Sequence, residues 1–531
     1  MKNNIMADGQ TLDVRFDVIV DDLEEPSNVS VKGDDNQTML NDTPSEGKQE
    51  NNKMDKEKPD LPGQGDERSS EPQGHSLRVI IARFRAQPGF RMRVLHTICC
   101  VWMFITLGWV LGIIGATFPE LRLIMDKNIE TASWIFTAGS LGYLLGSFVF
   151  GLLFDRFNRL LMLSTVTSLS AVAIAAMPWC SQFPLMVAIN LVSGFFTGGI
   201  DVSGNSHIVS IWGTDAAPFM QTLHFGFSAG GMIGPQTAKP FTAQKSCSQL
   251  NTAATTSTIL PFTNSTTSCD EQYGDTHIHY AYLIAGIGSI SASLPFLVLY
   301  CLSQRYQTYV STPLLNTEKQ EQKRRLPVLA MRKQIVFLGL LTTLISMYTC
   351  VENRFSSLIT TFTDEYLHMN KDDSLDLATV FWAAFAAGRF CSIPVTFFLK
   401  TRNMILIYLL FLTAVVIALL IASVYDIRQL IWTCTACAGL SMSAIFPAIF
   451  TWTTESVLTV TGKISATYLV GVSVFNMVFP LLYGFLMNNY SQMYFVYLLL
   501  GQSVLLLPFY VAIRMLIRIY IKPFTQPKVS A

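Results

Sequence analysis

Long apolar segments separated by short polar joints dominate the chain. A bilayer core needs about 20 apolar residues per helix, and twelve segments reach this length. They run approximately over 95–117, 132–154, 160–179, 184–210, 218–240, 280–302, 334–356, 376–398, 403–424, 428–452, 464–486 and 494–517. The pattern predicts an all-α integral membrane protein with twelve transmembrane helices.

Two longer interruptions, 241–279 and 303–333, break the series. The second lies between the sixth and seventh helices, so the chain divides six plus six. We therefore expect a first helical unit over 94–302, a cytoplasmic central loop over 303–333, a second unit over 334–517 and a cytoplasmic tail over 518–531.

Composition supports a membrane protein. The chain is 50% hydrophobic and 14% charged, with a mean hydropathy of +0.37, whereas soluble proteins average about 25% charged residues. Residues 1–76 hold 18 acidic and 8 basic residues, and the other 455 hold 19 and 29. The acidic, aromatic-poor segment 1–76 is predicted to be a disordered tail, followed by a basic juxtamembrane segment over 77–93.

The Lys and Arg residues predict the orientation, because they concentrate in cytoplasmic loops. With twelve spans, the basic clusters before the first helix, in the central loop and after the last helix fall on one side. Both termini are then cytoplasmic, and the plasma membrane is the expected location of the protein. No basic start followed by an apolar run marks a cleavable signal peptide.

The loop 241–279 falls outside the cell in this topology. It carries the sequon Asn264-Ser265-Thr266 and the cysteines Cys247 and Cys269. We predict glycosylation at Asn264, since sequons are used on the extracellular side. Cys247 and Cys269 are a possible disulfide, and both the bridged and the free states remain open.

The sequence lacks the motifs of an enzyme. It has no phosphate-binding glycine loop, no Cys/His metal spacing and no nucleophile motif. We expect no catalysis, no resident metal or cofactor, and no nucleic-acid partner, because the basic residues are juxtamembrane clusters. The expected surroundings are the lipid bilayer, and the expected oligomeric state is a monomer.

One apolar segment carries a carboxylate. Asp201 and Asn205 are four residues apart and share one face of a helix, and Gly194 and Gly198 form a small-xxx-small pair that lets another helix approach closely. A charge within a span costs at least ~2.5 kcal/mol, so it usually faces a polar cavity. A carboxylate held by a neighbouring helix, without ligand, is the alternative.

The joint between the second and third segments reads Gly151-Leu-Leu-Phe-Asp155-Arg156-Phe-Asn158-Arg159. It resembles the Gly-x-x-x-Asp-Arg-x-Gly-Arg signature of the major facilitator superfamily, with Asn158 in place of the second glycine. The resemblance implies two six-helix bundles around a central cavity that rock to alternate access. It also implies a gating role for Asp155, Arg156 and Arg159.

A closer resemblance covers most of residues 94–517. The runs Gly199-Ile-Asp201-Val-Ser-Gly204-Asn205, Ile211-Trp212-Gly213 and Ala217-Pro218-Phe-Met220-Gln221-Thr-Leu-His224-Phe225 resemble the sodium-dependent glucose transporters within that superfamily, of the major facilitator superfamily domain-containing 4 type. The same region is more distantly similar to fucose permeases, whose acidic residue and asparagine in helix four match Asp201 and Asn205.

One departure concerns the coupling ion. Fucose permeases carry an acid in helix one a few residues before a proline, where this sequence has Gly115-Ala-Thr-Phe-Pro119. The two-carboxylate arrangement for proton coupling is therefore incomplete. The modes of transport that remain open are coupling to Na⁺ and uncoupled transport.

The resemblance and the residue chemistry together give the candidate site. Hydroxyls of a sugar need paired donors and acceptors, which Asp201, Asn205, Gln221 and His224 supply. Glu352 either lines the cavity or pairs with Arg354 or Arg389, and Arg389 most simply neutralises a carboxylate. Asp201 and Asn205, with Ser203 or Ser206, are the candidate Na⁺ ligands.

These observations predict a secondary active transporter of a hexose, with glucose favoured, that is coupled to Na⁺. A facilitative carrier of a sugar or another small polar solute is one alternative. A non-transporting membrane sensor or scaffold that signals through the acidic tail is the other.

Overall fold

The computed structural model describes residues 88–154, 156–213, 216–243, 245–247, 271–273, 275–305, 331–457 and 462–520. The first half contains α2 (Pro88–Ala116), α3 (Phe118–Met125), α4 (Ile129–Ala132), α5 (Trp134–Leu153), α6 (Arg159–Ala176), η1 (Met177–Trp179), α7 (Phe183–Trp212), α8 (Ala216–Ala238), η3 (Lys239–Phe241), β1 (Lys245–Cys247), β2 (Glu271–Tyr273) and α9 (Ile278–Arg305). The second half contains α10 (Met331–Glu365), α11 (Lys371–Phe398), α12 (Thr401–Val424), α13 (Arg428–Met442), α14 (Ile445–Ser456), α15 (Gly462–Asn489) and α16 (Tyr494–Tyr520).

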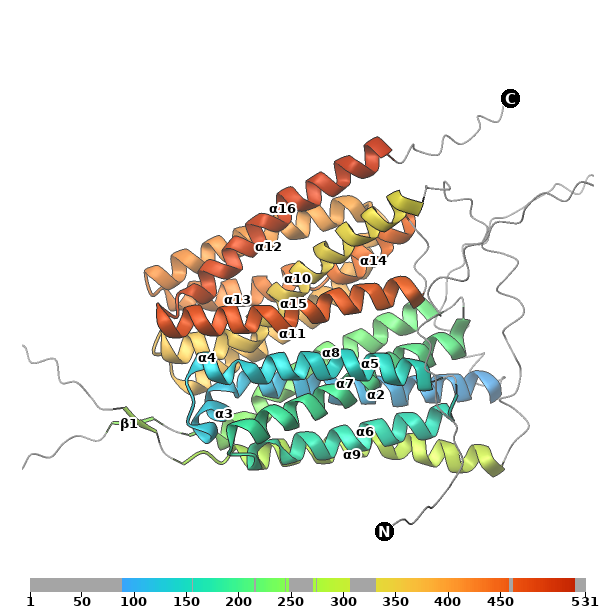
Figure 1. The fold of residues 1–531 in the computed structure, drawn as a ribbon, viewed down its shortest axis with the longest axis horizontal. Helices are drawn as coiled ribbons and strands as arrows, with labels where there is room; N and C mark the ends of the chain where they lie inside the picture. The colour runs from blue at the N-terminus through green and yellow to red at the C-terminus, as the bar shows by residue number, and fades with distance from the viewer. Residues whose placement is uncertain are drawn as a thin grey trace, which may run out of the picture. The chain divides into compact units, whose positions relative to one another are not determined.

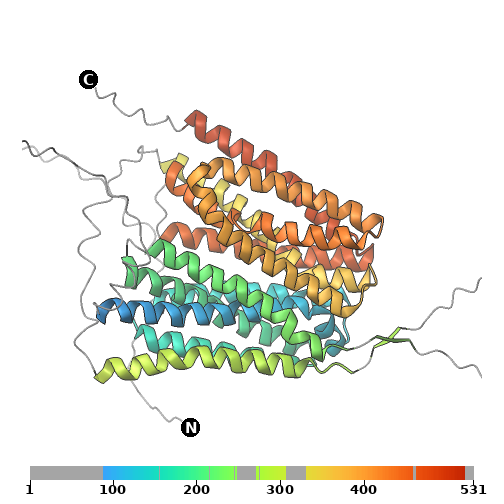
Figure 2. The same cartoon turned by 180° about the vertical axis from the view of Figure 1, so that it is seen from behind.

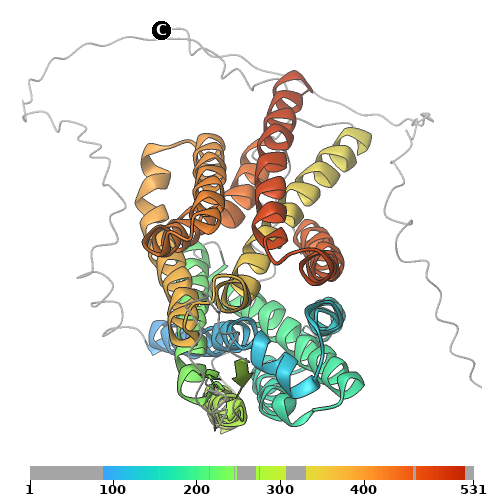
Figure 3. The same cartoon turned by 90° about the vertical axis from the view of Figure 1, so that its left-hand side faces the viewer.

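The long helices form two bundles, one from each half of the chain (Figure 1, Figure 2). In the N-bundle α2 packs on α8, α5 on α7 and α6 on α9; in the C-bundle α11 packs on α13, α12 on α16 and α10 on α15. The bundles meet where α8 contacts α11, α5 contacts α15 and α2 contacts α10. A view along the helices shows the two groups side by side (Figure 3). The predicted all-helical, six-plus-six architecture is confirmed.

The helix ends define two faces of this helical unit. At one, the strand face, α3, α4 and the turn between α10 and α11 lie together, and the antiparallel pair β1 and β2 projects from it (Figure 1). At the other, the terminal face, α2 begins and α16 ends.

Of the twelve predicted spans, the fifth, 218–240, differs in composition. Within the described chain, eleven helices are long and apolar enough to cross a bilayer. α8 has 23 residues and lies between α2 and α11, but polar residues and four glycines lower its hydropathy. Its position against two apolar helices explains why an amphipathic sequence is helical there.

Several predicted ends were wrong. α2 begins at Pro88, inside the expected juxtamembrane segment, and α16 continues to Tyr520, inside the expected tail. α10 runs nine residues past 356, because Leu358, Ile359 and Phe362 remain buried there. The single helix expected over 428–452 is two helices, α13 and α14. Pro447 lacks an N–H and its ring clashes with the carbonyl four residues back, so the helix restarts after Ser443.

Glycine governs how closely the N-bundle helices approach. A Cβ on Gly194 would lie 2.1 Å from the Gly139 oxygen, and one on Gly198 would lie 2.2 Å from the Tyr143 oxygen. The predicted close approach at Gly194 and Gly198 is therefore found, with α5 as the partner. The same packing joins α2 and α8, where a Cβ on Gly230 would lie 1.9 Å from the Ile105 oxygen.

A proline in α15 creates a polar contact between the bundles. Pro480 cannot donate to the carbonyl of Asn476, which is therefore free within its helix. Ser140 of α5 donates to this oxygen at 3.2 Å, and Thr137 donates to the Met477 oxygen at 2.7 Å. The Ser140 hydroxyl thus takes the place of the N–H group that Pro480 lacks, and Thr137 adds a second bond between the bundles.

Some predictions lie outside the described residues: the acidic tail 1–76, most of 77–93, the central loop, the gating residue Asp155, the sequon at Asn264 and the cysteine Cys269. Cys247 contributes its backbone to β1. The proposed glycosylation and disulfide therefore stay predictions.

The glycine packing predicts opposite effects for two equivalent substitutions. Gly230→Ala places a Cβ against backbone and should destabilise the protein by about 1–3 kcal/mol. Gly501→Ala, in a helix with nothing within 4 Å, should be neutral or stabilising by up to about 1 kcal/mol, since alanine favours helix. Thermal unfolding of the purified protein measures both. Equal melting temperatures for the two variants would refute the packing argument.

Candidate polar site between two helical bundles

Three ion pairs join the bundles at the strand face. Arg122 of α3 donates to Glu365 of α10, Lys371 of α11 donates to Glu120 of α3, and Lys239 of η3 donates to Asp376 of α11, the last at 2.7 Å. Each pair takes one partner from each bundle. Asn489 of α15 adds a 2.8 Å hydrogen bond to Glu130 of α4. We call the three ion pairs the strand-face latch.

The pairs differ in their exposure to water. The side chains of Glu120 and Lys371 are 2% and 7% exposed, whereas those of Lys239 and Asp376 are 29% and 35% exposed. The second oxygen of Glu120 also accepts from the Ala243 N–H at 3.2 Å. The hydrogen bond to Asp376 raises the pKa of Lys239 above its usual value, so this lysine remains charged at physiological pH.

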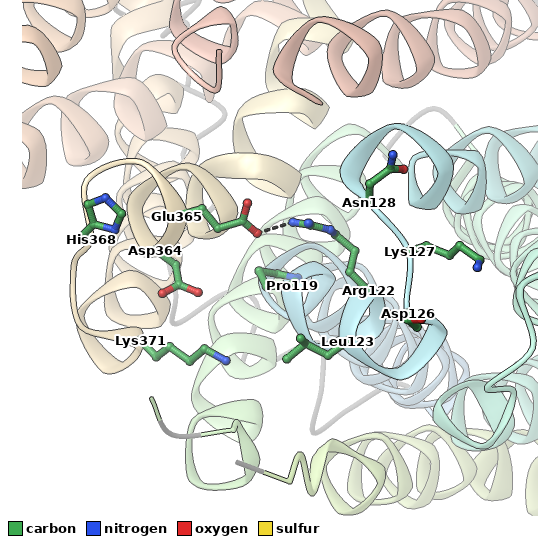
Figure 4. Close-up of a pocket in the computed structure, with 10 residues that line it drawn as sticks. All are labelled: Pro119, Arg122, Leu123, Asp126, Lys127, Asn128, Asp364, Glu365, His368 and Lys371. Carbon is green, nitrogen blue, oxygen red and sulfur yellow. Dashed lines mark hydrogen bonds and ion pairs between the residues drawn. The ribbon is translucent and has the colours of Figure 1, made fainter. Parts of the chain in front are cut away.

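A cavity of about 410 Å³ opens beside the latch. Figure 4 shows Arg122 and Glu365 pointing toward one another across it, with Asp364, His368 and Lys371 on the C-bundle side. Its lining carries both signs of charge and comes from both bundles: Pro119, Arg122, Leu123, Asp126, Lys127, Asn128, Asp364, Glu365, His368 and Lys371. The cavity therefore changes shape whenever the bundles move apart.

Deeper in the N-bundle, Asp201 is held by two side chains. Tyr143 of α5 donates to one carboxylate oxygen, and Asn205 donates to the other at 3.0 Å. Asn205 also donates to the Asp201 carbonyl at 2.9 Å. The predicted pairing of Asp201 with Asn205 on one helix face is therefore present, and the contact between α5 and α7 adds a phenol to it.

The oxygens of this cluster suit a small cation or a hydroxyl donor. The Asn205 Oδ1 is buried and has no hydrogen-bond partner, and a carboxylate that accepts two bonds keeps further lone pairs. The Ser203 hydroxyl is also buried and without a partner, but two residues along a helix place it on the far side from Asp201. Asp201 and Asn205 thus remain the candidate ligands, and Ser203 does not.

The C-bundle holds a second acidic cluster. The Tyr348 hydroxyl lies 2.7 Å from Glu352 Oε2 and also contacts the Met442 carbonyl at the end of α13. Arg389 lies near enough to attract Glu352 electrostatically. Its Nη1 donates at 2.8 Å to the His224 carbonyl and at 3.0 Å to the Ser228 hydroxyl, both in α8. Arg389 therefore links the C-bundle to the N-bundle.

The predicted grouping of four N-bundle residues is only partly present. The His224 ring packs edge-on against Phe104 at 6.0 Å, and its backbone oxygen serves Arg389. Gln221 is exposed. Among the described residues, no hydrogen bond joins Gln221 or His224 to Asp201 or Asn205. The Phe104 ring that contacts His224 also packs against Gly204 of α7.

The glycine that replaces an acid in helix one has a packing role. A Cβ on Gly115 of α2 would lie 3.0 Å from the Ser356 oxygen and from the Ser357 Cα, both in α10. A carboxylate side chain has no room at this contact between the bundles. The departure noted in the sequence is thus tied to how closely α2 and α10 approach.

The joint between α5 and α6 shows why asparagine replaces glycine there. The Asn158 side chain accepts from the N–H groups of Leu160 and Leu161 at 3.1 and 3.2 Å, so it caps α6, and asparagine is among the best capping residues. Arg156 and Arg159 are exposed, and Arg159 lies 5.0 Å from the Phe154 ring centroid. Their gating role stays a prediction.

Sequence reasoning missed the two tyrosines that hold the acidic groups. Tyr348 is four residues before Glu352 on one helix, a spacing that could have been read from the sequence. Tyr143 belongs to another helix, so only the fold brings it to Asp201. Four tryptophans of the helices could stack on a sugar ring. Trp382 lies at the bundle interface against Gly231, whereas Trp102 bonds Ser291 and Trp134 is 49% exposed. Trp109 packs against Gly288 of α9.

Comparison with known proteins identifies the relatives. Residues 98–480 match the Major Facilitator Superfamily. The chain is 30% identical over 426 residues to sodium-dependent glucose transporter 1 of Danio rerio, covering 78% of this chain and 68% of that protein. It is 28% identical over 410 residues to the Homo sapiens protein of that name, covering 76% and 75%. It is 25% identical over 434 residues to major facilitator superfamily domain-containing protein 4A of Mus musculus, covering 72% and 84%.

Solved structures share the fold at low identity. A D-xylose-proton symporter superimposes with a TM-score of 0.57 at 13% identity, covering 78% of this chain and 97% of the symporter. The nucleoside transporter NupG gives a TM-score of 0.54 at 11% identity, covering 79% and 99%. These similarities concern the arrangement of the helices.

The exposure of the latch pairs predicts unequal losses when each is broken. Glu120→Gln removes the negative charge from the buried Glu120–Lys371 pair, at a cost of about 3–5 kcal/mol. Asp376→Asn breaks a pair that water screens, at a cost of about 0.2–1 kcal/mol. Thermal unfolding in detergent compares the two. Losses of equal size, or a larger loss for Asp376→Asn, would contradict the assignment of Glu120–Lys371 as the dominant pair.

Proposed function

Because the chain belongs to the major facilitator superfamily, we propose that it is a secondary active transporter that moves a hexose together with Na⁺. Transporters of this superfamily bind their substrate near the bilayer midplane and alternate access by rocking one bundle against the other. Glucose is the favoured substrate, since the relatives at 28–30% identity bear the name sodium-dependent glucose transporter 1.

The observation that carries the proposal is the Asp201 cluster. A carboxylate near the middle of α7 is costly in a bilayer, and here it lies beside an amide oxygen that has no partner. Na⁺ takes several oxygen ligands, and Asp201 and Asn205 offer three side-chain oxygens within one helical turn. The Tyr143 hydroxyl can turn to donate to a sugar oxygen when an ion takes its place.

Residues of the C-bundle complete the proposed substrate contacts. Glu352 lies in the central part of α10 and supplies an acceptor. Arg389 lies in the central part of α11 and supplies a donor. Asn353 donates to Asn476 at 3.2 Å in the same region, which adds two amides suited to hydroxyls. A ligand that touches both bundles stabilises one position of the bundles over the other.

The proposed orientation places the strand face outside the cell and the terminal face in the cytoplasm. The basic residues at the ends of α2 and α16 support it. In this orientation the latch closes the extracellular side, and the carrier works as a monomer in the plasma membrane.

A facilitative carrier is the second candidate, and Gly115 favours it. The helix-one acid is absent, so coupling rests on Asp201 as the N-bundle carboxylate of the site. Uptake of radiolabelled glucose by oocytes in Na⁺ medium and in choline medium separates the two. We expect uptake to fall at least several-fold in choline. Equal uptake in both media would leave a facilitative carrier and remove the coupling.

The Asp201 cluster predicts a graded effect of two substitutions. Asp201→Asn removes the charge and should abolish Na⁺-dependent uptake. Tyr143→Phe removes one hydrogen bond to a charged group, worth about 1.5–3 kcal/mol, and should shift the Na⁺ concentration for half-maximal uptake while leaving transport detectable. Surface expression is measured alongside.

A matched control is Tyr282→Phe in α9, which removes a buried tyrosine hydroxyl that contacts Thr117 at 2.8 Å and forms no hydrogen bond to the Asp201 cluster. It should leave the Na⁺ dependence unchanged. Full Na⁺-dependent uptake by Asp201→Asn would return this carboxylate to a structural role.

A further inference from the structure

Arg354 is a buried cation at the contact between the bundles. It lies in α10, and 3% of the residue is exposed. Its guanidinium carbon lies 5.0 Å from the ring centroid of Phe136, which belongs to α5 in the other bundle. Both Nε and Nη1 are buried and have no hydrogen-bond partner.

The described groups around Arg354 are neutral. The titratable side chains that interact with it electrostatically are Cys350 and Tyr483. The Tyr483 hydroxyl already donates to Gln502 Oε1 at 2.9 Å, and Gln502 in turn donates to the Cys350 sulfur at 3.7 Å. No carboxylate among the described residues forms an ion pair with Arg354.

The other buried or half-buried cations of the interface differ in this respect. Lys371 is paired with Glu120 and Arg122 with Glu365. Arg389 donates to a carbonyl and a hydroxyl of α8. Arg354 alone among these four has no acceptor within the described chain.

The aromatic contact does not compensate for burial of the charge. Attraction to a ring face is weaker than the loss of hydration of a buried ion. Phe136 packs on the buried Phe118 of α3, with ring centroids 4.8 Å apart, so the ring beside the guanidinium belongs to an apolar cluster. An anionic partner would therefore stabilise the guanidinium strongly in these surroundings.

We propose that Arg354 holds a small monovalent anion at the junction of α5 and α10. The occupant is either chloride or the carboxylate of an organic solute, since a guanidinium donates to both through its five N–H groups. Because α5 and α10 belong to different bundles, the anion stabilises the arrangement in which the two helices are in contact. The site is separate from the Asp201 cluster and does not depend on hexose transport.

Thermal unfolding of the purified full-length protein in detergent tests the proposal. Sodium is held constant with the HEPES salt while sodium chloride is added in one series and sodium glucuronate in another. Glucose serves as the neutral match for glucuronate. A ligand that binds the folded state raises the melting temperature with its concentration, by about 2 °C when it is well above its dissociation constant.

Stabilisation by chloride identifies an inorganic anion, and stabilisation by glucuronate but not by chloride identifies a carboxylate solute. In either case Arg354→Met should lose the shift. Arg514→Gln is the matched control, because Arg514 lies at the terminal face and donates to Asn403, and it should keep the shift.

Arg354→Lys keeps the charge with fewer donors and guards against misfolding of the methionine variant. It should increase the anion concentration at half-maximal shift several-fold. The proposal is overturned if neither anion shifts the wild-type protein, if Arg354→Met keeps the shift, or if the midpoint is unchanged in Arg354→Lys.

Discussion

The cost of placing charge in an apolar medium organises the contact between the two bundles. An ion that leaves water must find an opposite charge or hydrogen-bond partners. At the strand face the protein meets this requirement across the interface, because Glu120, Arg122 and Lys239 find their partners in the other bundle. These ion pairs therefore exist only while the bundles touch on that face. When the bundles separate, water or a ligand must take the place of each lost partner.

The same requirement governs the groups at mid-depth. Asp201 and Glu352 each accept from a tyrosine hydroxyl, and each has a second polar neighbour, Asn205 in one case and Arg389 in the other. Hydroxyl partners can rotate, so these carboxylates can exchange a protein bond for a bond to an ion or a sugar. A site of this kind is stable when empty and still able to bind.

Close helix packing makes these polar contacts specific. Gly115 lets α2 reach α10, and the glycines of α5 and α7 bring the Tyr143 hydroxyl to Asp201. Pro480 releases a carbonyl that Ser140 uses. Backbone-to-backbone contacts leave little room for relaxation, so the bundles are expected to move as rigid bodies that exchange one set of polar contacts for another.

The sequence predicted what depends on local pattern. Apolar runs predicted the helices and the six-plus-six division, and spacing predicted the Asp201–Asn205 pair and the glycine contact. The sequence pattern does not predict contacts between segments that are distant along the chain. Lys371 and Glu120 are 251 residues apart, and Lys239 and Asp376 are 137 residues apart. Tyr143 likewise reaches Asp201 only through the packing of α5 on α7.

We expect the bundles to rock as rigid bodies about the central polar groups, with the latch keeping the strand face closed. Spin-label distances on both faces test this most directly, in a background without other reactive cysteines. One pair replaces the exposed residues Lys127 and Asn370 at the strand face, and the other replaces Phe157 and Arg402 at the terminal face. Neutralising Glu120, Glu365 and Asp376 should lengthen the first distance and shorten the second. Distances that stay unchanged, or that change in the same direction on both faces, would contradict it.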